Sequence, residues 1–176
     1  MKRKYLSDSY DVVKRYWADI LLPVGKLYAD SKFVPATSQL DYSRVTGIPI
    51  FDERPQNYFG ILLDPDTGIP APGEGKKRVT SKHAHLDYIV ELYGKIEPRY
   101  LVCFDQSYHR RHTLTREGQR TQKRDYLLTH ELHSFYYQSH APFLFASRSS
   151  QVIGEIQKTL LFAGISPNRL EPNVNI

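Results

Sequence analysis

Three aspartates that follow two apolar runs are the residues whose types and spacing point most directly to chemistry. Asp64 and Asp66, separated by one proline, follow the run 58–63, and Asp105 follows a second run over 99–104. Carboxylate oxygens are the preferred ligands of Mg²⁺ and Mn²⁺, whose remaining positions bind phosphate oxygens. The sequence therefore predicts that Asp64, Asp66 and Asp105 hold such an ion, and that Asp64 and Asp66 take part in catalysis.

The motif Asp-Pro-Asp-Thr-Gly also has a purely structural interpretation. Asp64 would cap a turn, Asp66 and Thr67 would bond to loop amides, and Gly68 would supply a positive φ. The motif alone leaves the two interpretations equal. The additional carboxylate at the end of the second apolar run favours the functional one.

Basic residues and histidines come directly after the second apolar run. Arginine can grip phosphate with two hydrogen bonds, and histidine transfers protons near neutral pH. We therefore expect Arg110 and Arg111 to bind phosphate and His109 to act as a general acid or base. Lys77 and Arg78, in a loop rich in Gly and Pro before an expected helix, are further candidates for phosphate binding. The alternative is that both basic segments are solvated surface.

Composition limits the class of protein. With 176 residues and 40% hydrophobic content, the chain fits a single α/β domain covering 1–176. A net charge of +5 favours polyanions such as nucleic acid or nucleotides as partners, without requiring them. One cysteine, Cys103, excludes an intramolecular disulfide and a cysteine-rich zinc site. We expect a cytoplasmic protein with no membrane association, because no signal-peptide pattern or spanning apolar run is present. The oligomeric state is not indicated.

Apolar periodicity predicts helices that alternate with strands. The expected helices are 9–21, one capped by Thr80 or Ser81 and ended by Gly94, one that follows the polar segment 108–124 and reaches about 132, and 149–164. The expected strands are 5–8, 26–35, 58–64, 99–107, 134–139 and 141–147, with a long irregular connection over 36–57. This order predicts a Rossmann-like three-layer sandwich with a mostly parallel sheet.

In such a sheet the polar residues that follow the strands converge at one edge, where open α/β sheets bind ligands. The residues expected at this edge are Asp8, Asp64, Asp66, Asp105, Gln106 and Ser147.

Two known motifs resemble the stretch around Asp64, each in part. Asp64-x-Asp66 after an apolar strand resembles the first motif of haloacid dehalogenase-like phosphatases, but Thr67 and Gly68 stand in the reverse order and the downstream acidic pair is missing. The run 63–66 also resembles the Asp-Pro-Pro-Tyr strand end of amino-methyltransferases, without the aromatic fourth residue or a glycine-rich turn after the first strand. That resemblance implies a methyltransferase-like fold without the methyl-donor site.

A broader resemblance is to a set of uncharacterised microbial proteins with an Asp-Pro-Asp-Asn/Thr-Gly strand end. These proteins share a short first strand ending in an aspartate and a later apolar strand ending in glutamine followed by a basic residue. The matching parts here are 5–8, 64–68, and Gln106 with Arg110 or Arg111. The resemblance implies one domain and brings no activity.

Acids and basic clusters predicted at one sheet edge favour a metal-dependent phosphodiesterase or nuclease acting on nucleic acid or a nucleotide, with Mg²⁺ or Mn²⁺ as cofactor. Two alternatives stay open. One is a methyltransferase-like protein that modifies nucleic acid. The other is a non-catalytic nucleic-acid-binding module that uses the basic segments alone.

Overall fold

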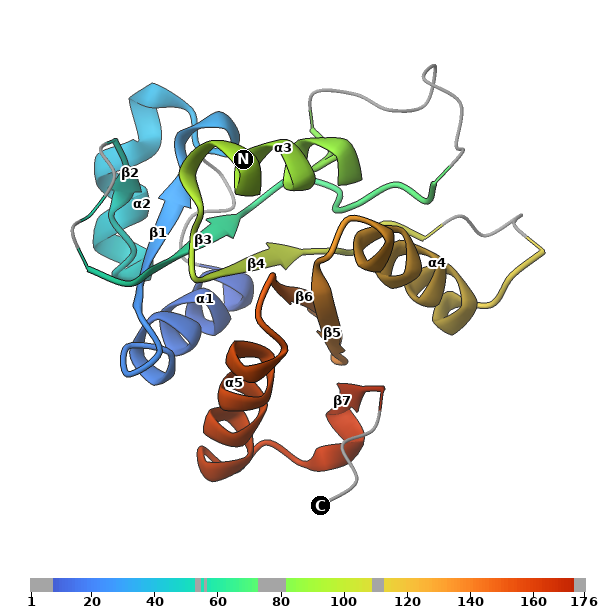
Figure 1. The fold of residues 1–176 in the computed structure, drawn as a ribbon. Helices are drawn as coiled ribbons and strands as arrows, with labels where there is room; N and C mark the ends of the chain where they lie inside the picture. Colours follow the sequence, from blue (N-terminus) through green and yellow to red (C-terminus); the bar gives the residue numbers. More distant parts are fainter. Residues whose placement is uncertain (1–7, 53–54, 56, 73–81, 109–112, 173–176) are drawn as a thin grey trace.

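The computed structural model describes residues 8–52, 55, 57–72, 82–108 and 113–172. Within these residues it is a mixed α/β fold with a seven-stranded sheet and five α-helices (Figure 1). The helices are α1 (Ser9–Ile20), α2 (Gln39–Thr46), α3 (Leu86–Ile96), α4 (Arg116–Thr129) and α5 (Ser150–Phe162). The strands are β1 (Lys26–Asp30), β2 (Ile50–Phe51), β3 (Phe59–Leu63), β4 (Tyr100–Phe104), β5 (His133–Tyr137), β6 (Phe143–Ser147) and β7 (Leu170–Glu171).

The sheet is parallel in one half and antiparallel in the other. Its order is β2-β1-β3-β4-β6-β5-β7. Strands β2, β1, β3 and β4 pair in parallel, whereas β6 is antiparallel to both β4 and β5, and β7 is antiparallel to β5. The α/β class is confirmed, but parallel pairing covers less of the sheet than the sequence predicted. Hydrophobic content marks a strand as buried without giving its direction.

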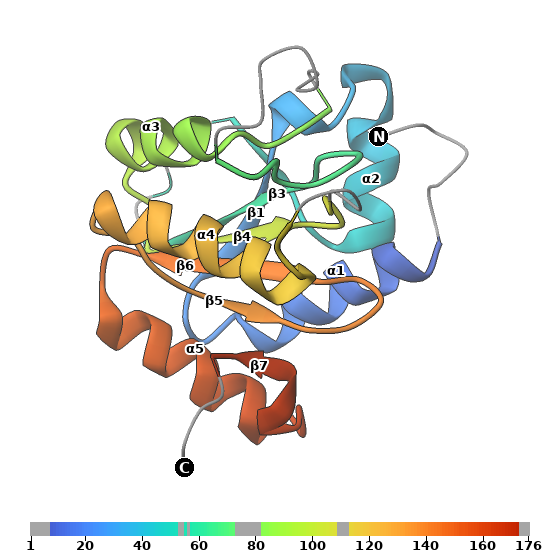
Figure 2. The ribbon, with the colours of Figure 1, turned by 90° about the vertical axis from the view of Figure 1, so that its right-hand side faces the viewer.

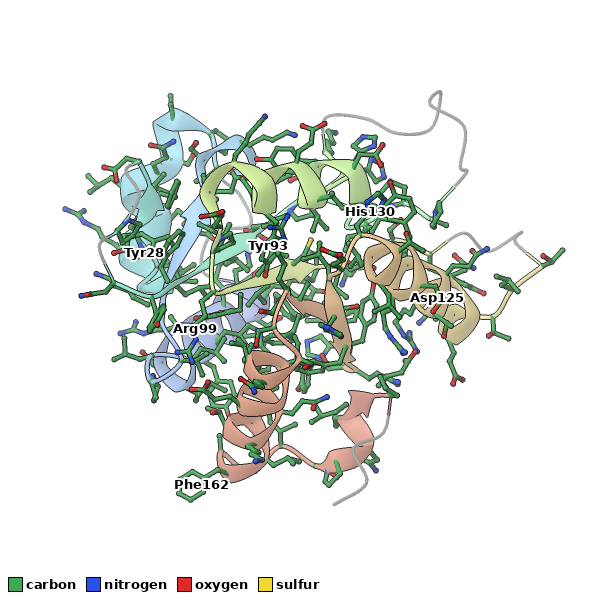
Figure 3. The ribbon with its side chains drawn as sticks, in the orientation of Figure 1. Tyr28, Tyr93, Arg99, Asp125, His130 and Phe162 are labelled. Atoms are coloured by element: carbon green, nitrogen blue, oxygen red, sulfur yellow. The ribbon has the colours of Figure 1, made fainter. Side chains whose placement is uncertain are left out.

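The central strands are apolar throughout because the sheet is covered on both faces. Neighbouring residues enter different cores: Leu62 and Val102 pack in one core, and Ile61 and Leu101 in the other. The first core includes side chains from α1, α2 and α5, and the second includes side chains from α3 and α4. Figures 1 and 2 show these helices on opposite sides of the sheet. Tyr93 of α3, labelled in Figure 3, illustrates the second core, since it is buried and donates a hydrogen bond to Ala146 O at 2.6 Å.

The prediction of α1 is confirmed, and its first residues show why it starts where it does. Asp8 is the N-cap residue, and its carboxylate accepts hydrogen bonds from the amides of Tyr10 and Asp11. The structure therefore shows the start of a helix at Asp8, where the sequence predicts the end of a strand. The remainder of that expected strand, 5–7, lies outside the described residues.

Several elements differ from the sequence predictions. The expected strand 26–35 ends at Asp30, because Asp30 caps a short 3-10 helix over Ser31–Phe33. The stretch 36–57, expected to be irregular, contains α2 and β2. Helix α3 begins at Leu86 after His85 and continues beyond Gly94 to a left-handed Glu97, whereas Thr80 and Ser81 lie outside the described residues. Strand β7 was not predicted, because two residues are too short to show a period.

The carboxyl ends of β1, β3, β4 and β5 lie at one edge of the sheet. In Figure 1 the arrows of β3 and β4 point to the right-hand side, which faces the viewer in Figure 2. Ser147 was expected at this edge, but β6 runs in the opposite direction and carries it to the other edge, where its hydroxyl donates to Arg99 O at 2.7 Å. None of the helices in the described ranges is both long and apolar enough to span a membrane.

Candidate functional site

Asp64 follows β3 and is buried beside a lysine from α1. Lys14 Nζ lies 2.7 Å from Asp64 Oδ2 and 2.9 Å from Asp11 Oδ1. The lysine reaches this place because Asp11, Lys14 and Trp17 recur every three residues and form the buried stripe of α1. The side chains of Asp11, Lys14 and Asp64 are almost inaccessible to solvent.

Burial and charge set the proton affinity of this cluster. Burial raises the pKa of the Asp64 carboxyl, and the Lys14 ammonium opposes this only in part. Burial by itself would lower the pKa of Lys14, but the charges of Asp64 and Asp11 outweigh it and raise that pKa. The two carboxylates thus flank one buried ammonium.

Tyr42 of α2 borders the same cluster. Lys14 Nζ lies 5.6 Å from the centroid of its ring, and its buried hydroxyl is close to the Asp64 carboxylate. Burial, and then the negative charge of Asp64, raises the pKa of Tyr42. Helix α2 therefore borders the cluster, although the sequence predicts an irregular connection over 36–57.

Asp105 follows β4 and is held by four hydrogen bonds. Its Oδ2 accepts from Lys123 Nζ and from the Tyr136 hydroxyl, each at 2.7 Å. Its Oδ1 accepts from the amides of Ile69 at 2.8 Å and Ser107 at 3.0 Å. Both carboxylate oxygens are thus engaged by protein donors, which gives Asp105 a structural role in joining the loops after β3 and β4.

The backbone at Gly68 explains why the Asp-Pro-Asp-Thr-Gly motif ends in glycine. Its φ is +106°, and a Cβ at this position would lie only 2.4 Å from Asp105 Oδ1. Its carbonyl accepts from the amide of Ala84 at 3.0 Å, so this loop is tied to the residues that precede α3. The expected positive φ is confirmed, and the glycine is required because the loop passes directly over Asp105.

The structure places the three predicted metal ligands in different environments. Asp64 and Asp105 are buried in separate ion pairs with Lys14 and Lys123, whereas Asp66 is exposed. In the described part of the chain, no group of three or more His, Cys, Asp or Glu side chains is arranged to hold a metal ion. The two strands are adjacent in the sheet, and the assignment of Asp64, Asp66 and Asp105 as metal ligands stays a prediction.

The basic residues predicted from the sequence lie outside the described residues. These are His109, Arg110 and Arg111 in one segment, and Lys77 and Arg78 in the other. Their roles remain predictions.

A pocket of about 390 Å³ opens at the carboxyl end of β3. We call it the acidic pocket because four carboxylates and two ammonium groups line it: Asp8, Asp11, Asp64, Asp66, Lys14 and Lys82. The rest of its lining includes two aromatic rings, of Tyr10 and Phe104, and the side-chain amide of Gln106. Four of the residues that the sequence placed at this edge, Asp8, Asp64, Asp66 and Gln106, do meet here.

A second pocket, of about 520 Å³, lies beside the first at the ends of β4 and β5. We call it the arginine pocket because three arginines, Arg116, Arg120 and Arg169, line it together with one carboxylate, Asp105. Its other polar lining includes His140, Tyr108 and Gln106. Arg120 pairs with Glu171 at 2.6 Å, whereas the Arg116 guanidinium lies 4.8 Å from the centroid of the Tyr108 ring. Arg169 donates to Gln138 O at 3.3 Å.

Gln106 belongs to both pockets. Its side-chain amide donates to the Tyr10 hydroxyl at 2.7 Å and to His140 O at 3.2 Å. The acidic and arginine pockets therefore meet at this amide, and one ligand can contact both.

Sequence reasoning missed the buried lysines and the arginines of α4 and the last turn before β7. A usable signal exists for the lysines, since Lys14 and Lys123 occupy the buried stripes of their helices, where apolar residues are expected. A charged residue at such a position requires a buried partner. Arg169 carries no comparable signal.

Comparisons with protein-family models, with curated proteins and with solved structures found no match.

Proposed function

We propose that the protein binds the phosphates of a nucleic acid or nucleotide at the carboxyl-end edge of its sheet. The observation that carries this proposal is the arginine pocket, which joins the acidic pocket at Gln106. Guanidinium groups bind phosphate with paired hydrogen bonds and keep their charge at every physiological pH. Arg116 and Arg169 are the residues proposed to bind phosphate.

The surrounding charges support this assignment. Arg120 already has a carboxylate partner, Glu171, and Lys123 is engaged by Asp105. Arg116 instead lies over an aromatic ring and Arg169 contacts a neutral carbonyl, so both positive charges can be used for an anion. The net charge of +5 assists association with a polyanion.

Fluorescence anisotropy with labelled single-stranded DNA and RNA tests the proposal. Replacement of Arg116 or Arg169 by alanine is expected to weaken binding about tenfold each, the loss typical of a hydrogen bond to a charged group. Arg148→Ala is the matched control, because this exposed arginine follows β6 at the opposite edge. Equal affinities in all three variants and the wild type would refute the phosphate assignment.

A second candidate function is metal-dependent phosphodiester cleavage, which the four carboxylates of the acidic pocket favour. Asp64 and Asp66 would hold Mg²⁺ or Mn²⁺ next to a phosphate bound in the arginine pocket. Asp105 has no part in this version, because its two oxygens already accept four hydrogen bonds. The ion would stabilise charge on the phosphate in the transition state.

Cleavage of labelled oligonucleotides with Mg²⁺, Mn²⁺ or EDTA tests this second function. We expect cleavage that requires the metal and is lost in Asp66→Asn, while binding in EDTA is retained. Binding without any metal-dependent cleavage would leave the first function and remove the second.

We further propose that the fold belongs to the Rossmann-like three-layer class and that the protein works in the cytoplasm. Helices in both hydrophobic cores support the first, and the buried free thiol of Cys103 supports the second.

A further inference from the structure

We propose that the ligand is a single-stranded oligonucleotide that lies across three consecutive pockets, rather than a mononucleotide held in one. This inference rests on the proposed function and specifies its substrate class. A third pocket, of about 370 Å³, lies at the end of β1 and is lined by Lys32, Phe33, Gln39, Asp66 and Lys82, among others. We call it the Lys32 pocket.

The three pockets form one series along the sheet edge. The Lys32 pocket shares Asp66 and Lys82 with the acidic pocket, and the acidic pocket shares Gln106 with the arginine pocket. They follow the ends of β1, β3, β4 and β5, and the sheet order places β6 between the last two. The acidic pocket therefore lies between two other pockets.

The length of this series exceeds one nucleotide. From β1 to β5 there are four strand spacings of about 4.8 Å, which amounts to about 19 Å. A stacked strand advances about 3.4 Å per nucleotide, so the edge accommodates about five nucleotides, and fewer if the strand is stretched.

Charge along the series alternates in a way that suits a phosphodiester chain. Lys32 lines the first pocket alone, and Lys82 and Asp66 line both the first and the second. Three further carboxylates, of Asp8, Asp11 and Asp64, lie in the second pocket, and three arginines with Asp105 line the third. Phosphates are thus attracted at the two ends. The central pocket repels phosphate and offers acceptors to the donor groups of a base or sugar.

The aromatic residues favour an unpaired strand over a duplex. Tyr108 and Arg116 form a stacked pair in the arginine pocket, and Tyr10 lies in the acidic pocket, where its ring packs edge-on against Phe104. Unpaired bases stack on such side chains, whereas the bases of a duplex are already stacked on each other. Separate pockets along a groove therefore suit single-stranded nucleic acid.

Competition anisotropy with thymidine mono-, di-, tetra- and hexanucleotides tests this inference. Affinity is expected to rise about tenfold or more from the mononucleotide to the tetranucleotide and to level off by the hexanucleotide, as the pockets fill. The salt dependence should steepen by about 0.7 in logarithmic slope for each additional phosphate contacted. A duplex of the same length should compete less well than the single strand.

Two variants separate the ends of the series. Lys32→Ala should weaken binding of the hexanucleotide and leave that of the mononucleotide unchanged, whereas Arg116→Ala should weaken both; thermal melts confirm that each is folded. Mononucleotide and hexanucleotide binding with equal affinity would overturn the inference and leave the proposed function. Tighter binding of the duplex would also overturn it. Failure of every ligand to bind would overturn the proposed function itself.

Discussion

Asp64 and Asp105 occupy equivalent places and have different environments. Each follows a buried parallel strand, and each pairs at 2.7 Å with a buried lysine from a helix. Asp105 also accepts three other hydrogen bonds, whereas Lys14 of the Asp64 cluster is shared with Asp11. Each aspartate lines a pocket, Asp64 the acidic pocket and Asp105 the arginine pocket. The position of a carboxylate at a strand end therefore does not by itself indicate a functional role. The number of protein donors that already engage it separates a structural residue from a candidate ligand-binding residue.

The largest effect is expected from removing the charge of Asp105. Asp105→Asn leaves Lys123 buried without its counter-ion, and breaking a buried pair costs about 3–5 kcal/mol of unfolding free energy. Urea unfolding measures the loss. The control is Asp125→Asn (Figure 3), on the exposed side of α4, the helix that carries Lys123. It should cost less than about 0.5 kcal/mol. Similar values for the two variants would contradict the structural role of Asp105.

Alkaline pH should weaken both clusters together. Burial, followed by the charge of the adjacent aspartate, raises the pKa of Tyr42 beside Asp64 and of Tyr136 beside Asp105. The unfolded chain releases these protons near pH 10 and the folded chain retains them, so stability falls as the pH rises above that value. These two groups contribute about 3 kcal/mol of the loss by about pH 11. Tyr88, Tyr93 and Tyr100, whose pKa burial also raises, add to it. Urea unfolding from about pH 8 to 11 measures this, and constant stability would contradict it.

Asp64→Asn should cost less than Asp105→Asn. Lys14 keeps Asp11 as a charged partner. We expect a loss of about 1.5–3 kcal/mol, the range for one disrupted hydrogen bond to a charged group. The same urea unfolding experiment compares the two variants directly. A loss as large as that of Asp105→Asn would mean that the two clusters are equally structural.

The last comparison removes one hydroxyl from each cluster. Tyr136→Phe loses one of the four hydrogen bonds to the Asp105 carboxylate and should cost about 1.5 kcal/mol, the lower end of the range for a hydrogen bond to a charged group. Tyr42→Phe removes a buried hydroxyl that lies near Asp64 outside good hydrogen-bonding geometry, and should cost less than Tyr136→Phe. Thermal melts of the two variants give the difference, and the reverse order would contradict the assigned hydrogen bonding.

Part of this architecture could be predicted from the sequence. The continuous apolar runs of β3 and β4 indicate strands buried on both faces, and the period of α1 fixes that helix within one residue of its end. The direction of β6 could not be predicted, because hydrophobicity does not record whether a neighbour is parallel. Ser147 was consequently assigned to the wrong edge.

The candidate site was predicted less well than the strands around it. Asp64 and Asp66 do meet at a pocket, but nothing local to Asp105 shows that four donors from distant segments surround it. The arginine pocket is formed by α4 and by Arg169 before β7, which approach each other only through the antiparallel half of the sheet. Such a pocket depends on topology, so residue spacing does not reveal it.

Phe162 at the end of α5 and Arg99 at the amino end of β4 mark the part of the molecule that should not respond to ligand (Figure 3). Hydrogen–deuterium exchange with and without hexathymidylate compares it with the carboxyl-end edge in one experiment. Slower exchange is predicted at 31–36, 64–69, 105–108 and 138–142, with no change around Arg99 or Phe162. Protection at the amino end of β4, or at neither edge, would contradict the account.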